Sequence, residues 1–256
     1  MAKLSEFEGG RLLPVRSQLV LSSTTITVID DGWAIVAGMG GGAGGSKSFA
    51  AGNSAAWGVK AFPVTAGSLI GFVIGAGGLA ATAMNTPSSA GGTTLITLNG
   101  SALMTCPGGE AGQPSTAGKT PVTSTVTGAD YWTPGRQPQT FLAGAAVDVG
   151  NGTNNTSGAW GDHSVDLQGL LAGVPAGAYF WPFDISFHGS QPGSPGVGTG
   201  PGSGIAAGIF AGGSGHSDAS YQTPPGRGAS AGRTGSNNPP HNGGAGLAHL
   251  RLFKRV

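Results

Sequence analysis

Runs of glycine alternate with pairs of β-branched or apolar segments along the first half of this chain. Three such pairs end in glycine-rich stretches, at residues 38–45, 75–78 and 107–109. Glycine occupies 51 of the 256 positions, and each glycine inside a helix costs about 1 kcal/mol relative to alanine. A helical fold is therefore disfavoured, and the regular alternation indicates strands followed by glycine segments that belong to the fold.

The β-branched and apolar segments predict short strands joined by turns. The predicted strands cover residues 24–29, 33–37, 57–64, 69–74, 93–98 and 101–105, and a last strand covers 247–256. Asp30-Asp31-Gly32 and Asn99-Gly100 have the composition of hairpin turns, and residues 65–68 also turn the chain. We expect the last strand to close a sheet that begins near Thr24.

The glycine runs have two interpretations. They are flexible linkers, or they are left-handed polyproline-II segments that pack side by side because glycine leaves the backbone uncovered. The second interpretation explains why the runs follow strand pairs. The predicted fold is all-β: an antiparallel β-sandwich or jelly-roll-like sheet with packed polyglycine or polyproline-II segments and long loops.

Composition divides the chain into two parts. Residues 1–23 are an N-terminal lead-in or docking segment, and residues 24–256 are a single glycine-rich β domain. An aromatic, loop-rich insert covers about 113–187, with a short strand expected at 180–187. A polyglycine block covers about 189–246. Loops as long as this insert are usually functional.

Charge and cysteine content exclude several classes of function. Charged residues make up 9% of the chain and the net charge is +1, so no nucleic acid partner is expected. No apolar stretch is long enough for membrane insertion. The N-terminus lacks the apolar core of a signal peptide, which predicts synthesis in the cytoplasm. Cys106 is the only cysteine, so neither an intramolecular disulfide nor a thiolate zinc site is expected.

Motifs for catalysis are weak, and the chain is predicted not to be an enzyme and to carry no cofactor. Residues 38–43 match a dinucleotide-binding glycine pattern, but no helix-forming run and no acidic residue follow at the required spacing. Residues 216–218 place His, Ser and Asp together on a polar segment, without sign of an activated serine. Asp162, His163 and Asp166 suit a divalent ion, but solvated loop residues are the favoured interpretation, and no metal site is predicted.

The aromatic residues offer a better indication of binding. Aromatic side chains on polar loops are typical recognition anchors, because they supply a large contact area at a low entropy cost. Alternatively they fill a thin core, which is what we expect for Trp33, Trp57 and Phe72 on strands. The candidate receptor-binding residues are Tyr131, Trp132, Trp160, Tyr179, Trp181 and Tyr221.

The order of these features resembles the glycine-rich domain of phage tail-fibre and tail-tip proteins, which are adhesin-like. The resemblance rests on the Trp33 strand, the glycine run 38–45, the segment 72–78, and the closing glycines 243–246 before a basic and apolar final strand. It covers roughly 24–112 and 189–256. In that family, polyglycine-II helices form a sandwich, and loops at its end contact the host receptor.

The resemblance implies a virion structural protein, a tail-fibre or tail-tip component that contributes to host-cell attachment. Its partners would be other virion proteins of the tail fibre, baseplate or capsid, and a host surface receptor, either protein or polysaccharide. A homo-oligomer is also expected, since fibres are commonly homotrimers, whereas tip adhesins can be single chains. Because 1–23 and 113–187 lie outside the resemblance, no family site residue is carried over to them.

Three alternatives remain open at this point. The protein could be a capsid head fibre or decoration spike, which localisation on the particle would reveal. It could be a depolymerase of surface polysaccharide, which would release reducing ends. It could be an ice-binding polyglycine protein, for which only the threonines within 93–97 and 123–127 hint at a regular array.

Overall fold

The computed structural model of the chain describes residues 12–46, 53–84, 86–111, 124–133, 165–166, 179–180, 227–228 and 241–255. These residues form strands, turns and extended segments, and none of them lies in a helix. The strands are β1 (Leu12–Val20), β2 (Thr24–Thr27), β3 (Gly32–Met39), β4 (Trp57–Val64), β5 (Leu69–Val73), β6 (Thr94–Leu98), β7 (Ser101–Cys106), β8 (Tyr131–Thr133), β9 (Val165–Asp166), β10 (Tyr179–Phe180) and β11 (Leu247–Arg255).

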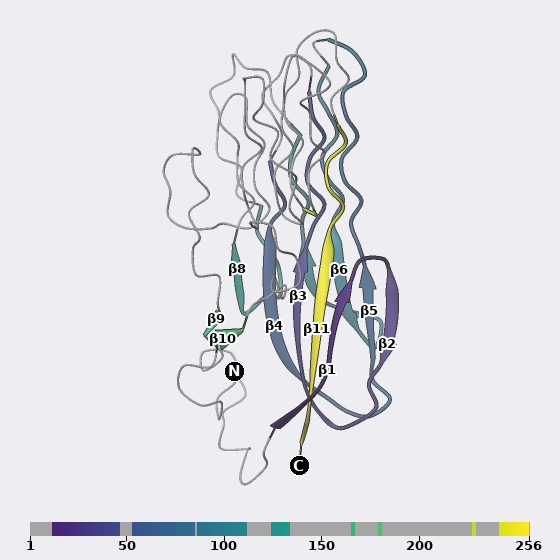
Figure 1. Ribbon diagram of the computed structural model, residues 1–256, viewed down its shortest axis with the longest axis vertical. Helices are drawn as coiled ribbons and strands as arrows, with labels where there is room; N and C mark the ends of the chain where they lie inside the picture. Colours follow the sequence, from purple (N-terminus) through teal and green to yellow (C-terminus); the bar gives the residue numbers. More distant parts are fainter. Residues whose placement is uncertain are drawn as a thin grey trace, which may run out of the picture.

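The strands build two main antiparallel sheets, which fill the lower half of Figure 1. The five-stranded sheet has the order β1-β11-β3-β4-β8, and the four-stranded sheet has the order β2-β5-β6-β7. Strands β9 and β10 form a separate antiparallel pair. The predicted all-β, antiparallel fold is therefore confirmed for the described part of the chain.

The predicted hairpin at Asp30-Asp31-Gly32 is wrong. Strand β2 before it pairs with β5 in the four-stranded sheet, whereas β3 after it pairs with β4 and β11 in the five-stranded sheet. The turn at residues 65–68 is also a crossover, since it leads from β4 to β5 and so from one sheet to the other. Local turn composition predicted both turns, but it does not determine which strands pair.

The two crossovers hold each other by hydrogen bonds. The Val28 amide donates to the Ser68 carbonyl at 2.9 Å, and the Gly67 amide donates to the Val28 carbonyl at 2.9 Å. The Ala66 amide donates to Oδ1 of Asp31 at 2.8 Å. This mutual pairing satisfies backbone groups that two separate hairpins would have satisfied locally.

The hairpin at Asn99-Gly100 is confirmed. It joins β6 to β7, and Leu98 pairs with Ser101. Asn99 and Gly100 have φ angles of 49° and 82°, and two successive residues with positive φ suit the right-handed twist of a hairpin. Asn99 also accepts a hydrogen bond on Oδ1 from the Leu69 amide at 2.8 Å, which ties the turn to β5.

The last strand occupies a different place from the one expected. Strand β11 lies between β1 and β3, so it belongs to the five-stranded sheet and not to the sheet that contains Thr24. Leu250, for example, has Gln18 on one side and Val36 on the other. Within the predicted N-terminal segment 1–23, residues 12–20 are strand β1, and their pairing with β11 brings the two described ends of the chain together.

A hydrophobic core formed by described residues lies between the two main sheets. Strand β5 shows the alternation that a sheet with one buried face requires, with Ile70 and Phe72 buried and Leu69 and Val73 exposed. Side chains of both sheets contribute to the core, which gives a sandwich-like packing. Its larger members are Val28, Val36, Phe62, Val64, Ile70, Phe72, Ile96, Met104, Leu250 and Leu252.

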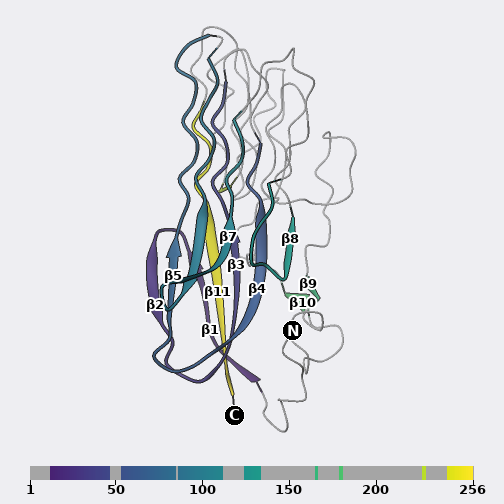
Figure 2. The same ribbon diagram turned by 180° about the vertical axis from the view of Figure 1, so that it is seen from behind.

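Glycine-rich segments continue from the sheets and form the other half of the described molecule (Figure 1). We call these segments together the glycine bundle. They are residues 40–46, 53–56, 74–81, 88–93, 107–111, 227–228 and 241–246. Figure 2 shows the bundle and the four-stranded sheet from the opposite side.

Segment 40–46 lies at the centre of the glycine bundle, and all seven of its residues are buried. Its amides donate to successive neighbours: Gly41 to Gly92, Gly42 to Gly244, and Ala43 to Asn53, at 2.8 to 3.1 Å. Three residues later the same neighbours recur, since Gly44 donates to Ser89 and Gly45 donates to His241. Two further segments donate to its carbonyls, through the amides of Gly78 and Gly109.

The surrounding segments are also bonded to one another in a closed ring. Segment 74–81 bonds to 88–93, which bonds to 107–111, which in turn bonds to 53–56. Gly228 links 53–56 to 241–246, and 241–246 returns to 74–81. The centre is therefore enclosed on all sides by backbone.

Glycine is required where two of these backbones touch. A Cβ atom built on Gly41 would overlap the carbonyl oxygen of Ala76, and one built on Gly44 would overlap that of Leu79. Both the glycines and the carbonyls are three residues apart. The same spacing governs burial from Val73 to Thr82, where exposed, half-buried and buried residues follow one another in a repeat of three.

Candidate functional site

The exposed aromatic residues of the described chain lie on β8, the edge strand of the five-stranded sheet. Tyr131 pairs with Val59 of β4, and Trp132 pairs with Gly58. Tyr131 is 47% exposed and Trp132 is 37% exposed. Neighbouring residues of a strand point to opposite faces, so the two aromatic side chains present a surface on each side of the edge.

Tyr131 is supported by a buried aromatic residue. Its ring centroid lies 5.7 Å from that of Trp57, with the planes inclined by 53°. Trp57 is only 2% exposed, as expected for an aromatic residue on a strand, but it does not belong to the hydrophobic cluster between the two sheets. A tilted aromatic contact of this kind restricts the Tyr131 ring, which lowers the entropy lost when the ring binds a partner.

Asp130 fixes the start of β8 against β4. Its Oδ1 lies 3.5 Å from Nζ of Lys60, and its Oδ2 accepts a hydrogen bond from the Ala61 amide at 2.9 Å. The Asp130 amide donates to the Val59 carbonyl at 2.9 Å. The carboxylate and the ammonium are both partly exposed, so they also offer hydrogen-bonding groups beside Trp132. We call Lys60, Asp130, Tyr131 and Trp132 the aromatic edge patch.

The described residues show no contact between this patch and the other four predicted receptor-binding residues. For Tyr179 the structure describes the backbone, which pairs with Asp166 between β10 and β9. Trp160, Trp181 and Tyr221 lie outside the described residues, as do Asp162 and His163 of the suggested ion site and most of the expected strand 180–187.

The glycine pattern at 38–43 has no room for a dinucleotide. Strand β3 runs through Met39, and residues 40–46 then enter the buried centre of the glycine bundle. A pyrophosphate would need those amides, but they donate to neighbouring carbonyls. These amides therefore stabilise the packing of the glycine bundle.

A Ser–His pair in the five-stranded sheet was missed by the sequence analysis. Ser17 Oγ of β1 lies 2.9 Å from Nε2 of His249 on β11, across 232 positions of sequence. His249 is 1% exposed. Nucleophilic catalysis also requires oxyanion donors and a group that orients the histidine. The contact as described provides a partner for a buried imidazole and ties β1 to β11.

Cys106 has a buried, protonated thiol at neutral pH. It lies fully buried at the end of β7, and burial raises the pKa of its thiol from 9.0 to about 12. Its Sγ donates to the Gly38 carbonyl at 3.2 Å. Because the thiolate is the reactive form, this cysteine does not act as a nucleophile at neutral pH.

Among the described residues, no group of three or more His, Cys, Asp or Glu side chains is arranged to hold a metal ion. No helix in this described part of the chain has the length and apolar character needed to cross a membrane.

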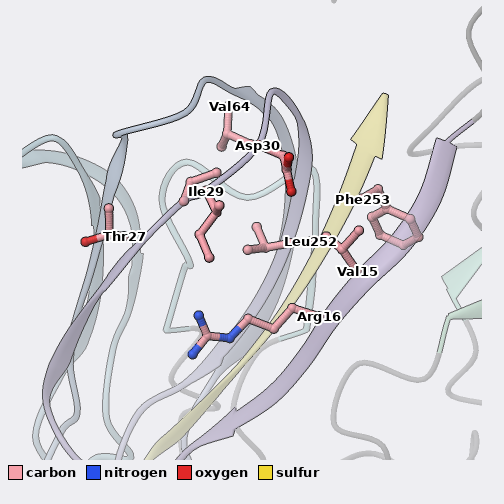
Figure 3. Close-up of a pocket in the computed structure, with 9 residues that line it drawn as sticks. Val15, Arg16, Thr27, Ile29, Asp30, Val64, Leu252 and Phe253 are labelled. Atoms are coloured by element: carbon pink, nitrogen blue, oxygen red, sulfur yellow. The ribbon is translucent and has the colours of Figure 1, made fainter. Parts of the chain in front are cut away.

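A small pocket opens between the two sheets, at the end away from the glycine bundle. It has a volume of about 140 Å³ and is lined by Val15, Arg16, Thr27, Val28, Ile29, Asp30, Val64, Leu252 and Phe253. Figure 3 shows these side chains arranged around the opening between β1, β11 and the chain that follows β2. We call it the inter-sheet pocket.

No protein-family model matches this chain, and no curated protein matches it.

Proposed function

We propose that this protein is a phage virion structural protein, a tail-fibre or tail-tip component that contributes to host-cell attachment. The observation that carries the proposal is the enclosed centre of the glycine bundle, in which residues 40–45 are bonded to their neighbours through backbone hydrogen bonds. A body of this kind projects from the sheets without a side-chain core of its own.

The proposal includes a conformation for the bundle. Polyproline-II helices have three residues per turn and no internal hydrogen bonds, so each amide must find a partner on another segment. The return to the same neighbour after three residues, and the burial repeat of three from Val73 to Thr82, support packed polyglycine-II segments. Flexible linkers would not require a glycine where a backbone carbonyl touches Gly41 or Gly44.

Such a bundle suits a particle that acts outside the cell. The amides of its central residues 40–45 are paired, and an unpaired buried amide is costly, so local opening is opposed by many bonds together. Charged groups, which would make the bundle sensitive to salt, are few in a chain with 9% charged residues. The aromatic edge patch then supplies the contact with the receptor, because exposed tyrosine and tryptophan dominate many binding surfaces.

Binding of the labelled full-length protein to a panel of bacterial strains tests the proposal by flow cytometry. We expect saturable binding to at least one strain, and competition with adsorption of the phage that carries the protein. Replacing Tyr131 and Trp132 by alanine together should weaken binding by about 30-fold, the effect of losing one binding hot spot. Leu69→Ala, at an exposed apolar residue of the other sheet, is the matched control.

Two outcomes would contradict the proposal. Binding that is absent from the strains that the phage infects, for the assembled oligomer as well, argues against adhesion. Gold-labelled antibody on the capsid of intact particles, and not on the tail, favours a head fibre or decoration spike instead. Light scattering on the purified protein tests the proposed homo-oligomer.

A further inference from the structure

The inter-sheet pocket lies at the end of the molecule opposite the glycine bundle. Met39 pairs with Leu247 at the end of β3 where the bundle begins, whereas Gly32 pairs with Lys254 at the other end. The pocket residue Leu252 lies near this second end, as do the crossovers between the sheets (Figure 1). A partner bound here would leave the bundle projecting away from it.

The pocket is an opening of the hydrophobic core. Val28, Val64 and Leu252 form its floor and are 2%, 5% and 6% exposed, respectively. Val15 and Ile29 at its rim are 49% and 79% exposed, which makes Ile29 the most exposed large apolar residue among those described. An apolar cavity of about 150 Å³ is known to hold benzene, so about 140 Å³ accommodates one aromatic ring or one branched aliphatic side chain.

The charges at the rim are unequal. Asp30 is neutralised by Lys254, whose Nζ lies 2.9 Å from Oδ1 of Asp30. The guanidinium of Arg16 reaches over the opening (Figure 3) and donates through Nη2 to the neutral Oε1 of Gln18. Within the described part of the chain Arg16 forms no ion pair, so the rim keeps one uncompensated positive charge.

We propose that the inter-sheet pocket is the docking site for another virion polypeptide, which inserts one apolar side chain and places an adjacent carboxylate on Arg16. The carboxylate is either an Asp or Glu side chain or the partner's C-terminus. An arginine fork can hold both carboxylate oxygens, which fixes the direction of the inserted side chain. That the partner is a virion protein rests on the proposed function, whereas the chemistry of the pocket does not.

The small molecule 3-phenylpropionate is a direct probe of this chemistry, since it carries one aromatic ring and one carboxylate. In methyl NMR of the full chain, we expect saturable shifts at Val15, Ile29 and Leu252. The neutral amide of the same shape, 3-phenylpropanamide, should bind about threefold more weakly, as expected for an exposed ion pair. Arg16→Gln should abolish that difference. Val15→Trp, at an exposed strand position, should fill the pocket and abolish the shifts at Ile29 and Leu252 with either compound.

The pocket chemistry is overturned if neither compound shifts these methyl groups. It is also overturned if Arg16→Gln leaves the preference for the carboxylate unchanged. The unfolding midpoint of each variant serves as the control for an intact fold.

Incorporation into particles tests the partner. In phage carrying Arg16→Glu, the copies of this protein per purified virion should fall at least about tenfold, by analogy with truncated hot spots at interfaces. Leu69→Ala should leave the copy number unchanged. Normal incorporation of both Arg16→Glu and Val15→Trp would overturn the docking proposal and leave the proposed function standing.

Two other results distinguish the proposed function from the proposed docking site. Absence of the wild-type protein from virions would defeat the proposed function, while binding of 3-phenylpropionate would still stand. Dimers that dissociate in Arg16→Glu would assign the pocket to a second copy of this chain, and so overturn docking of another polypeptide.

Discussion

The two halves of the described molecule are stabilised in opposite ways. Between the sheets, side chains such as Phe72 and Ile96 fill the interior, and the backbone pairs at the strand edges. In the glycine bundle the backbone itself fills the interior, and the central segment 40–46 carries no side chain larger than serine. The same chain therefore contains two kinds of core: hydrocarbon side chains fill the core between the sheets, and peptide groups fill the core of the glycine bundle.

The difference teaches what each half tolerates. A side-chain core loses stability when atoms are removed, because a cavity remains. A backbone core loses stability when atoms are added, because the neighbouring carbonyl cannot rotate away as a side chain can. Deletions should therefore harm the sheets, and additions should harm the bundle.

The largest effect is expected for adding methyl groups to the bundle. Gly41→Ala with Gly44→Ala would drive two Cβ atoms into the carbonyls of Ala76 and Leu79. We expect a loss of about 5 kcal/mol in the free energy of unfolding, at the upper end of overpacking costs. Urea unfolding measures this loss, and amide hydrogen exchange should show that protection fails first at residues 41–45.

Gly67→Asn is the matched control for the glycine pair. A Cβ at Gly67 would meet nothing within 4 Å, and asparagine tolerates its positive φ of 88° better than most residues. A stability within about 0.5 kcal/mol of wild type is expected. Equal stability of the double-alanine variant and this control would break the comparison, since the bundle would then have room for side chains.

A slightly smaller effect is expected for removing a side chain from the sheets. Phe72 is 2% exposed in the core, and Phe72→Ala should cost about 4 kcal/mol because it leaves a cavity. Val73→Ala, at the exposed neighbouring position, should change stability by no more than about 0.5 kcal/mol. Thermal and urea unfolding of the two variants measure the contrast, and similar losses would show that the sheets lack a specific side-chain core.

The smallest effect is expected for the pH dependence of stability that Cys106 causes. This residue lies at the boundary between the two halves, where its thiol donates to the Gly38 carbonyl. Burial raises the pKa of the folded thiol from 9.0 to about 12. Below pH 9 both states keep the proton, and stability does not depend on this group. Between pH 9 and 12 the unfolded thiol ionises and the folded one does not, so stability falls by about 1.4 kcal/mol per pH unit.

Cys106→Ala isolates that contribution. The difference in unfolding free energy between wild type and this variant, measured by urea unfolding from pH 8 to 11, should be flat below pH 9 and should decline above it. A difference that stays flat up to pH 11 would mean that the thiol is open to water and the boundary is loose.

Sequence patterns predicted the elements better than their partners. The bounds of β4 match the predicted 57–64, and Trp57 and Phe72 are buried as expected. Trp33, also expected in the core, is only half-buried. Strands are detectable because their signal is local, in β-branched residues and turn composition. The crossovers at 30–32 and 65–68 were not predicted because pairing depends on contacts that no local pattern contains.

The candidate sites show the same division. Tyr131 and Trp132 are exposed on β8, and their role in recognition stays a prediction. The Ser17–His249 contact and the inter-sheet pocket join residues from opposite ends of the chain. The pairing of β1 with β11 brings the two ends together at both sites, and a single sequence contains no signal for that pairing.

The repeat of exposed residues changes at Val73, so one surface of the molecule carries outward-facing side chains at two different spacings. Along β5, outward positions such as Leu69 and Val73 recur every second residue, or about every 7 Å. In the bundle the outward positions Val73, Ala76, Leu79 and Thr82 recur every third residue, about 9 Å apart for the proposed rise of about 3.1 Å per residue. A partner whose own groups repeat at one of these distances matches the outward positions of one half. Along the other half its groups lose register with the outward positions within two repeats. This flank of the molecule can therefore be matched along its sheet or along its bundle, and a regular ligand that fits one half is a poor fit for the other.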